Sequence, residues 1–455
     1  MKVFLIVPGC LNPKQTYREY PLGLGLIAAA LRPLGCEVAV FDQNAEGADD
    51  QRLLARLRDF APQVVGFSLI TPSYPAAQRQ IRRVQREFPQ VPIVAGGIHA
   101  SLFPEDLLAD GATAVVVGEG CAPMVELIRR LSDGRPWRDV PGVTCRDADG
   151  RAIPAAPRVS SLLPDDVGMV DRDVFNLPLY THHSMLASLG CPYRCAFCAN
   201  YSGRLLHQGI AIRSDDRLVA EMRQLADRYG AKQVFFVDDV FLLWRANVLR
   251  FCRRLQRERL PIEWVAQMRA DAIDPEVAEA MAAANCRRVY FGVESGSEAV
   301  LKRVRKGIDR ETIRLGVRSA KEAGLRVKTG WVFGLPCTLA EQYESVSFMR
   351  ELRPHEISIH QLIPFPGTQY YDRPAEFGVR IRDPKDFASF CYGGLGDNVS
   401  FDYLSQRQLV ELLEQTVAML ESEGYVSSDR ATPEDQYVFS TPLNSLSMAV
   451  FHPAD

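Results

Sequence analysis

The chain lacks the features of a membrane-spanning or secreted protein. Its N-terminal hydrophobic run, Met1 to Pro8, is too short for a signal peptide or a membrane span, so we expect it to form a strand. The 11 cysteines are an odd number and are scattered along the chain, which disfavours a disulfide framework. We therefore expect a cytoplasmic protein without a membrane span.

The chain also lacks an excess of charge of either sign. Its formal net charge of -3 provides no general basic field, so we expect no nucleic-acid partner. Short basic runs such as Lys302 to Arg310 are interpreted as solvated helix faces. A length of 455 residues with ordinary apolar and charged fractions indicates two or three globular domains, each with its own core.

Three cysteines in one predicted loop are the most informative feature that is present. Cys191, Cys195 and Cys198 follow a mostly apolar segment that begins at Ser184 and is predicted to be a strand. Three thiolates cannot complete the four-cysteine set of a simple 4Fe-4S electron carrier, so one iron would stay open to a substrate or cofactor. A structural zinc site is the alternative, and it requires a fourth ligand, for which His207 is the nearby candidate.

The C-x3-C-x2-C spacing, with aromatic Phe197 directly before the last cysteine, resembles the signature of radical S-adenosylmethionine (SAM) enzymes. The resemblance implies that Cys191, Cys195 and Cys198 hold an oxygen-sensitive 4Fe-4S cluster whose fourth iron chelates the amino and carboxylate groups of SAM. It also implies an external electron donor of the flavodoxin or ferredoxin type. The donated electron cleaves SAM to methionine and a 5'-deoxyadenosyl radical, which abstracts hydrogen from unactivated carbon.

Residues 1 to 135 are predicted to form a doubly wound, Rossmann-like parallel sheet, because short apolar strands alternate with amphipathic helices. The predicted strands are 2–7, 37–41, 64–68, 93–95 and 114–117, and the predicted helices are 22–34, 51–59, 74–87, 104–109 and 122–131. Ligands bind at the carboxyl ends of the strands in such sheets. No G-x-G-x-x-G motif follows the first strand, which disfavours a dinucleotide.

This half of the chain resembles the cobalamin-binding domain that precedes many radical SAM cores, because Ser68-Leu69-Ile70 is followed at the next strand end by Gly96-Gly97. The resemblance implies that Ser68 bonds the nucleotide tail of cobalamin and that Gly96 and Gly97 let the tail approach the backbone closely. It also places three further residues in the cofactor's surroundings: His99, Gly118 and Glu119.

The usual axial histidine of that domain is absent here, since its position is occupied by Gly23. We therefore expect water or a residue of the Cys10 to Tyr20 loop to face the cobalt. A Rossmann-like domain kept only for packing or oligomerisation is the alternative.

Residues 136 to 180 are predicted to connect two domains through a small hairpin, with its turn at Asp147 to Gly150, and a proline-spaced coil. Residues 181 to 385 repeat strand and helix about six times, which predicts a partial (β/α)6 TIM-type barrel that is open on one side. The predicted strands after the cysteine loop are 233–237, 262–267, 288–293, 326–333 and 356–362. The predicted helices are 216–229, 246–257, 275–284, 297–304, 312–323 and 339–351.

The carboxyl ends of the barrel strands, where chemistry is expected, carry Asp238, Asp239, Arg269, Glu294 and Ser295. By resemblance to the same family, Glu294 and Ser295 should lie near the ribose or methionine of SAM. Arg269 is a candidate partner of the SAM carboxylate, which a guanidinium can clamp with two hydrogen bonds. Asp238 and Asp239 should orient SAM or substrate, or else cap the following helix. Phe197 of the cysteine loop should pack near the adenine.

Residues 386 to 455 are predicted to form a short, mainly helical C-terminal region that covers the substrate. The amphipathic helix 405–423 is expected to close the open side of the barrel. The segments Phe390 to Gly394 and Tyr437 to Phe439 are candidates to line the substrate cavity.

These features together predict a cobalamin-dependent radical SAM C-methyltransferase. By family mechanism it would use one SAM as methyl source and a second as radical source, on an unactivated carbon of a small-molecule or lipid precursor. A radical cyclase, ring-rearranging or oxidising enzyme with the same cofactors is one alternative. A non-catalytic cobalamin or iron-sulfur sensor is another.

Overall fold

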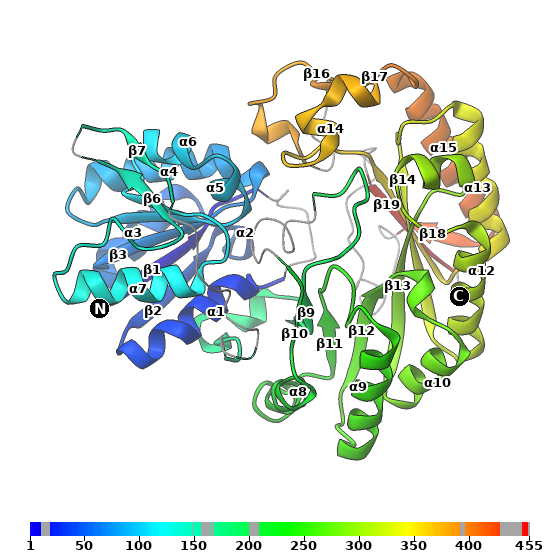
Figure 1. The fold of residues 1–455 in the computed structure, drawn as a ribbon, viewed down its shortest axis with the longest axis horizontal. Helices are drawn as coiled ribbons and strands as arrows, with labels where there is room; N and C mark the ends of the chain where they lie inside the picture. Colours follow the sequence, from blue (N-terminus) through cyan, green and yellow to red (C-terminus); the bar gives the residue numbers. More distant parts are fainter. Residues whose placement is uncertain are drawn as a thin grey trace. The chain divides into compact units, whose positions relative to one another are not determined.

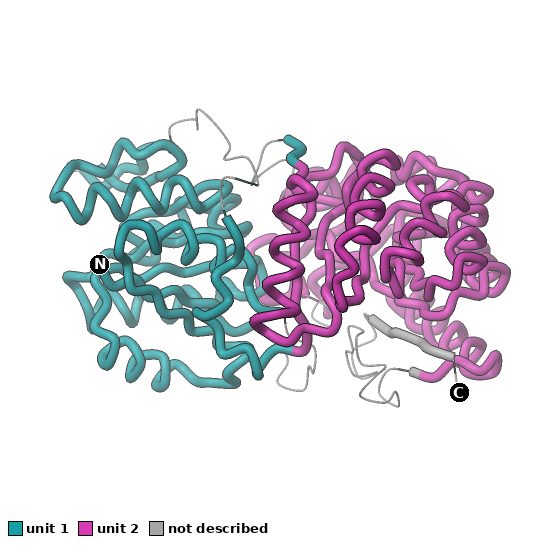
Figure 2. Tube along the Cα trace, turned by 90° about the horizontal axis from the view of Figure 1, so that it is seen from below, with its two compact units in different colours: residues 1–13, 18–180, 201–211 teal, residues 14–17, 181–200, 212–455 magenta. Residues whose placement is uncertain are grey.

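The computed structural model describes residues 1–10, 19–147, 149–155, 165, 168–199, 209–391, 396–427 and 448–453. The chain separates into two compact units, shown in two colours in Figure 2. Unit 1 comprises residues 1–13, 18–180 and 201–211, and unit 2 comprises residues 14–17, 181–200 and 212–455. Within the described part of the chain, no helix combines the length and the hydropathy that crossing a bilayer requires.

Unit 1 is built on a seven-stranded sheet in the order β2-β1-β3-β4-β5-β6-β7. Its first five strands are parallel and are β1 (Lys2–Val7), β2 (Glu37–Asp42), β3 (Val64–Ser68), β4 (Ile93–Gly96) and β5 (Ala114–Val116). Their apolar runs are buried because helices cover both faces of the sheet. The predicted doubly wound parallel sheet is therefore confirmed.

The helices of unit 1 lie on both sides of the strands, with α4 and α6 on one side and α1 and α7 on the other (Figure 1). They are α1 (Leu22–Leu31), α2 (Gln43–Glu46), α3 (Asp50–Phe60), α4 (Tyr74–Glu87), α5 (Ile98–Leu102), α6 (Pro104–Ala109) and α7 (Cys121–Ser132). Side-chain caps fix some of their starts; Asp49, for example, accepts a hydrogen bond from the backbone N–H of Arg52 at 2.9 Å. The sequence did not predict α2 and α5, which are too short to show helical periodicity.

The predicted hairpin forms, but it belongs to the first sheet. Strands β6 (Val143–Arg146) and β7 (Ala152–Ile153) pair antiparallel with each other, and β6 pairs antiparallel with β5. From the sequence, these residues are predicted to lie in a connector. They instead extend the parallel sheet by two antiparallel strands at one edge.

Unit 2 contains six parallel strands, which confirms the predicted partial barrel. In spatial order these are β8 (His183–Met185), β11 (Gln233–Phe236), β12 (Glu263–Met268), β13 (Cys286–Glu294), β14 (Arg326–Phe333) and β15 (Glu356–Gln361). The outer helices are α8 (Asp215–Tyr229), α9 (Arg245–Glu258), α10 (Pro275–Ala283), α11 (Glu298–Arg303), α12 (Arg310–Glu322) and α13 (Leu339–Leu352), several of which flank the strands in Figure 1.

The C-terminal region adds strands as well as the predicted helix. Strand β19 (Met448–Pro453) pairs antiparallel with β15, and β18 (Tyr425–Ser427) pairs antiparallel with β19. Helix α15 (Gln406–Ser422) contacts α13, since Tyr343 Oη donates to Gln415 Oε1 at 2.6 Å. The remaining short elements are β9 (Ser188–Leu189), β10 (Ala211–Ile212), α14 (Gln369–Asp372), β16 (Val379–Ile381) and β17 (Val399–Phe401).

The imidazole of His99 lies inside the core of unit 1. It is fully buried, and its ring centroid lies 4.5 Å from that of Tyr74 and 5.0 Å from that of Phe103. Burial disfavours the charged imidazolium and lowers the pKa of His99 to about 3. The ring is therefore neutral at physiological pH and supports the strand-end loops by packing.

We expect the stability of unit 1 to fall as the pH drops from 6.5 toward 3. In that window an unfolded chain protonates His99 while the buried ring does not, so each pH unit costs up to about 1.4 kcal/mol. Urea unfolding at pH 7 and pH 5 should show this loss in the wild type and a smaller loss in His99→Leu. The control Phe103→Leu removes a neighbouring ring without removing a titratable group and should keep the wild-type pH dependence. An unchanged pH dependence in His99→Leu would contradict the assignment.

Candidate functional site

A buried carboxylate fixes the chain where it enters the cysteine loop. Asp238, at the end of β11, accepts hydrogen bonds from the backbone N–H groups of Ala187 and Ser188 and from the Ser188 hydroxyl, the last at 2.6 Å. Burial raises the pKa of Asp238 to about 7, although these hydrogen bonds favour the ionised form. From the sequence, Asp238 is predicted to orient SAM or substrate, or to cap a helix. Its observed partners make it a positioning residue for the loop, while Asp239 is exposed.

The three thiols of the cysteine loop differ in exposure. Cys191 and Cys195 are half-buried and Cys198 is exposed. Burial raises the pKa of the Cys191 and Cys195 thiols. Backbone bonds shape the loop, because Cys198 N donates to Cys195 O at 3.1 Å and Ala196 N donates to Val304 O at 2.9 Å.

The donor set fits an iron-sulfur cluster better than a single metal ion. Among the residues that the structure describes, no three His, Cys, Asp or Glu side chains converge on one ion. A 4Fe-4S cluster does not need such convergence, because each thiolate binds a different iron. His207, the predicted fourth ligand of a zinc site, lies outside the described residues.

Arg269 holds the other side of the loop. Its guanidinium carbon lies 3.5 Å from the ring centroid of Tyr193, between the first two cysteines, which is a close cation–π contact. Its nitrogens donate to both carboxylate oxygens of Asp271 at 3.0 Å and to Lys306 O at 2.8 Å. These contacts make buried Arg269 a positioning residue for the loop, and its predicted contact with the SAM carboxylate stays a prediction.

A buried ion pair lies at the end of β13. Lys306 Nζ is 2.8 Å from Glu294 Oε1, and the two side chains are only 7% and 14% exposed. Glu294 has φ +70, and the pairing of β13 with β14 shifts register between Gly292 and Glu294. A Cβ at Gly292 would lie 2.4 Å from Glu294 Oε1, so a side chain there would displace the Glu294 carboxylate from its present position. Left-handed backbone at a non-glycine residue costs about 1–3 kcal/mol and is concentrated at functional sites.

Ser295, the next residue, does not join this ion pair and forms hydrogen bonds with other residues. It is fully buried, its hydroxyl lies 3.1 Å from Ser345 Oγ, and it accepts a hydrogen bond from Ser297 N at 3.1 Å. The described contacts thus tie the end of β13 to α13. The predicted place of Ser295 beside SAM stays a prediction.

A cavity of about 320 Å³ lies inside unit 2, between the cysteine loop and the ends of β12 to β15. Its lining is mostly aromatic, aliphatic or uncharged polar, and consists of Phe197, Gln267, Tyr290, Glu294, Val332, His360, Gln361, Leu362, Ile363 and Phe365. Desolvation and the charge of Lys328 lower the pKa of His360 to about 3, so this ring is neutral. Glu294 is therefore the charged group of the lining, and it suits hydroxyls or an ammonium group of a ligand.

Of the residues predicted from the barrel sequence, Phe197 and Glu294 share this cavity. The sequence analysis did not single out Tyr290, Val332 or His360 as site residues. They lie within strands, where a lining residue and a core residue have the same alternating pattern.

At the carboxyl edge of the first sheet, the segments that follow β3 and β4 are hydrogen-bonded to each other. Leu69 N donates to Gly96 O at 2.9 Å, and His99 N donates to Leu69 O at 3.2 Å. Gly97 has φ +95, and a Cβ there would lie 2.6 Å from Leu69 O, so the backbone itself requires glycine at this position. Gly96 is different, because a Cβ there would meet its nearest atoms only at 3.8 Å.

The same edge leaves room for a ligand. Gly96 offers space that the domain does not need for its own packing, Ser68 is half-buried, and the side chain of Ile70 is 46% exposed. An exposed apolar side chain beside small and hydroxyl groups fits the tail and ring of a large cofactor such as cobalamin.

Other predicted residues of unit 1 have structural partners. Gly118 N donates to Ser101 Oγ at 2.8 Å, and the Glu119 carboxylate accepts from Cys121 N at the start of α7. His99 is buried behind the loop, as described above. Gly23 is exposed in α1, and most of the predicted axial-ligand loop, residues 11–18, lies outside the described residues. The cofactor roles of these residues stay predictions.

Comparisons with known proteins match both halves of the chain. A protein-family model for the B12 binding domain matches residues 12–128, and one for the radical SAM superfamily matches residues 185–348. The chain is 28% identical to an uncharacterised methyltransferase of Pyrococcus horikoshii, over 82% of this chain and 83% of that protein. It is 23% identical to the anaerobic magnesium-protoporphyrin IX monomethyl ester cyclase of Rubrivivax gelatinosus, over 79% of this chain and 67% of that protein.

A solved structure shares the fold. The radical SAM methyltransferase TsrM of Kitasatospora setae, with tryptophan and a SAM analogue bound, has a TM-score of 0.72 and 22% identity. The match covers 92% of this chain and 88% of TsrM. The cysteine loop, the partial barrel and the preceding parallel sheet all agree with these matches. The chain therefore carries a B12-binding domain followed by a radical SAM domain.

Proposed function

We propose that the protein is a C-methyltransferase that uses SAM both as methyl source and as radical source, on an unactivated carbon of a small-molecule or lipid precursor. The observation that carries the proposal is the cavity of unit 2, which brings Phe197 of the cysteine loop and Glu294 together in a chain that also has a cobalamin-binding domain. This cavity would receive SAM beside the cluster.

In this proposal the residues of the protein bind the cofactors and orient SAM. Cys191, Cys195 and Cys198 would hold the 4Fe-4S cluster, and the strand-end edge with Ser68 and Gly96 would hold cobalamin. Bound together, these cofactors supply one-electron cleavage of SAM and a carrier for its methyl group. Phe197 would pack on the adenine, and Glu294, held by Lys306, would accept hydrogen bonds from the SAM ribose or amino group. The mostly uncharged lining would exclude water from the reacting carbon.

Methyl transfer is favoured over the other reactions of this family by the methyltransferase relative, which matches over most of its length. A cyclisation or oxidation with the same cofactors is the second candidate, and the cyclase relative favours it.

Cys195→Ala should abolish formation of 5'-deoxyadenosine from SAM under dithionite, because the cluster would lose one of its three ligands. Iron and sulfide per chain should also fall after anaerobic reconstitution. Cys252→Ala is the matched control, since Cys252 is buried in α9 and should keep both properties. Zinc in place of iron in the wild type, or full iron and activity in Cys195→Ala, would refute the assignment.

Methyl-labelled SAM separates the two candidate reactions. The reconstituted wild type, incubated anaerobically with a small-molecule and lipid extract, should form S-adenosylhomocysteine and 5'-deoxyadenosine together and transfer the label to a new product. Omission of cobalamin should remove the S-adenosylhomocysteine and the labelled product. Deoxyadenosine without S-adenosylhomocysteine would instead support the cyclisation or oxidation.

The Glu294–Lys306 pair can be tested for a role beyond stability. Glu294→Gln and Lys306→Met each leave a buried charge unpaired, so each should lower the free energy of unfolding by about 3–5 kcal/mol. The double variant removes both charges and should recover most of this stability. If Glu294 contacts SAM, the double variant should still bind SAM at least about tenfold more weakly, as measured by equilibrium dialysis. Wild-type SAM affinity in the double variant would show that the pair is only structural.

A further inference from the structure

A basic segment lies directly against the cysteine loop. Residues 302–306, with the sequence Lys-Arg-Val-Arg-Lys, comprise the last two residues of α11 and the turn that follows it. Val304 O accepts from Ala196 N at 2.9 Å, and Lys306 O accepts from Arg269 Nη1 at 2.8 Å. The segment therefore touches the loop between two of its cysteines, although its charges gave no such indication in the sequence.

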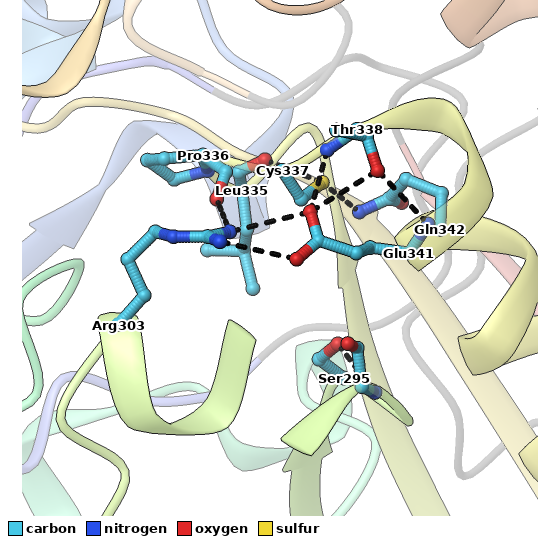
Figure 3. Close-up of polar contacts among 9 residues, drawn as sticks. Ser295, Arg303, Leu335, Pro336, Cys337, Thr338, Glu341 and Gln342 are labelled. Carbon is cyan, nitrogen blue, oxygen red and sulfur yellow. Dashed lines mark hydrogen bonds and ion pairs between the residues drawn. The ribbon is translucent and has the colours of Figure 1, made fainter. Parts of the chain in front are cut away.

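Two of the four cations in this segment are neutralised by the protein. Arg303 forms an ion pair with Glu341 at 3.1 Å and donates to Pro336 O at 2.5 Å, as Figure 3 shows. Glu341 also accepts from Thr338 N in the capping box of α13, so its position is fixed. Lys306 forms the buried pair with Glu294. These two cations hold the segment on the barrel.

The other two cations, Lys302 and Arg305, are exposed. Arg194, inside the cysteine loop, is exposed as well. In the described ranges, none of the three forms an ion pair. Arg305 has φ +57 and its N–H donates to Lys302 O at 3.1 Å, so the turn that ends α11 fixes the backbone of this exposed residue.

The charges of the segment and the cysteine loop act on one buried neighbour. Tyr370 is 1% exposed, and burial is the main cause that raises its pKa. The charges of Arg303, Arg305 and Cys195 also influence this phenol. Arg305 directly follows Val304, whose backbone oxygen accepts from Ala196 N, so this turn lies beside the stretch of the loop between Cys195 and the exposed Cys198.

We propose that Arg194, Lys302 and Arg305 form a docking surface, the cluster-side basic patch, for a small acidic protein that carries one electron. The inference rests on the proposed function, because SAM cleavage requires that the cluster be reduced from outside. In the docked complex the carrier is oxidised by one electron and the cluster is reduced by one, with no bond made or broken. The chain as a whole has a net charge of -3, so a local positive patch would direct an acidic partner to this face.

The experiment compares two reductants and two double variants. Lys302→Glu/Arg305→Glu reverses the patch, and Glu keeps the same unbranched Cβ at the left-handed position of Arg305. The matched control is Lys232→Glu/Arg257→Glu, which makes the same change of charge at two exposed positions of unit 2, before β11 and in the last turn of α9. Reconstituted full-length proteins are assayed for 5'-deoxyadenosine with dithionite, or with an acidic flavodoxin and its reductase. Binding of oxidised flavodoxin is measured separately by calorimetry at low and high salt.

We expect the patch variant to lose flavodoxin binding and flavodoxin-driven SAM cleavage by about tenfold or more at low salt, and to keep the dithionite-driven rate. The control should keep all three, and salt should weaken flavodoxin binding to the wild type but not to the patch variant. Wild-type binding by the patch variant, equal losses in the control, or binding of RNA in place of flavodoxin would overturn the inference. Absence of deoxyadenosine from the wild type with dithionite would refute the proposed function instead, and the binding measurement would still decide the docking surface.

Discussion

The site depends on holding one short loop of three cysteines against the barrel without using the thiols themselves. Three interactions do this. The Asp238 carboxylate binds the backbone before the loop, the Arg269 guanidinium stacks on Tyr193 inside it, and Val304 O binds Ala196 N near its end. Two of these anchors are ionisable groups that the protein buries, which is costly unless each has several partners. Asp238 accepts from two backbone N–H groups and a hydroxyl, and Arg269 donates to Asp271 and Lys306 O, so their partners offset that cost.

The anchors also show that residue type alone does not tell whether a polar side chain at a strand end contacts a ligand or supports the structure. Asp238, Arg269, Glu294 and Ser295 all follow barrel strands, and the sequence treats them alike. The structure gives Asp238 and Ser295 partners within the protein, whereas Glu294 lines the cavity. A polar residue at the end of a strand thus supports a neighbouring loop in some cases and lines a cavity in others, and only its partners distinguish the two.

The sequence predicted the fold well because its signals were local. Buried strands such as β1 and β3 are short apolar runs, and several helices begin at a side-chain cap such as Asp49 or Ser405. It missed features that depend on distant pairing. Strand β19 pairs with β15, and the hairpin β6–β7 joins the first sheet because β6 pairs with β5. Both pairings join strands whose partners the local sequence does not identify. For the same reason it could not find Tyr290 or His360, since a cavity lining is defined by what lies across the barrel.

Two adjacent glycines of unit 1 show the same limit of prediction from sequence. By sequence, Gly96 and Gly97 were predicted to serve one purpose, the close approach of a cofactor. Gly97 is required by the backbone, because a side chain would collide with Leu69 O, and this would hold in a domain that bound nothing. Gly96 has no such collision, so packing alone does not explain its lack of a side chain. Of the two positions, the backbone therefore explains Gly97, and the predicted close approach of a cofactor at Gly96 stays a prediction.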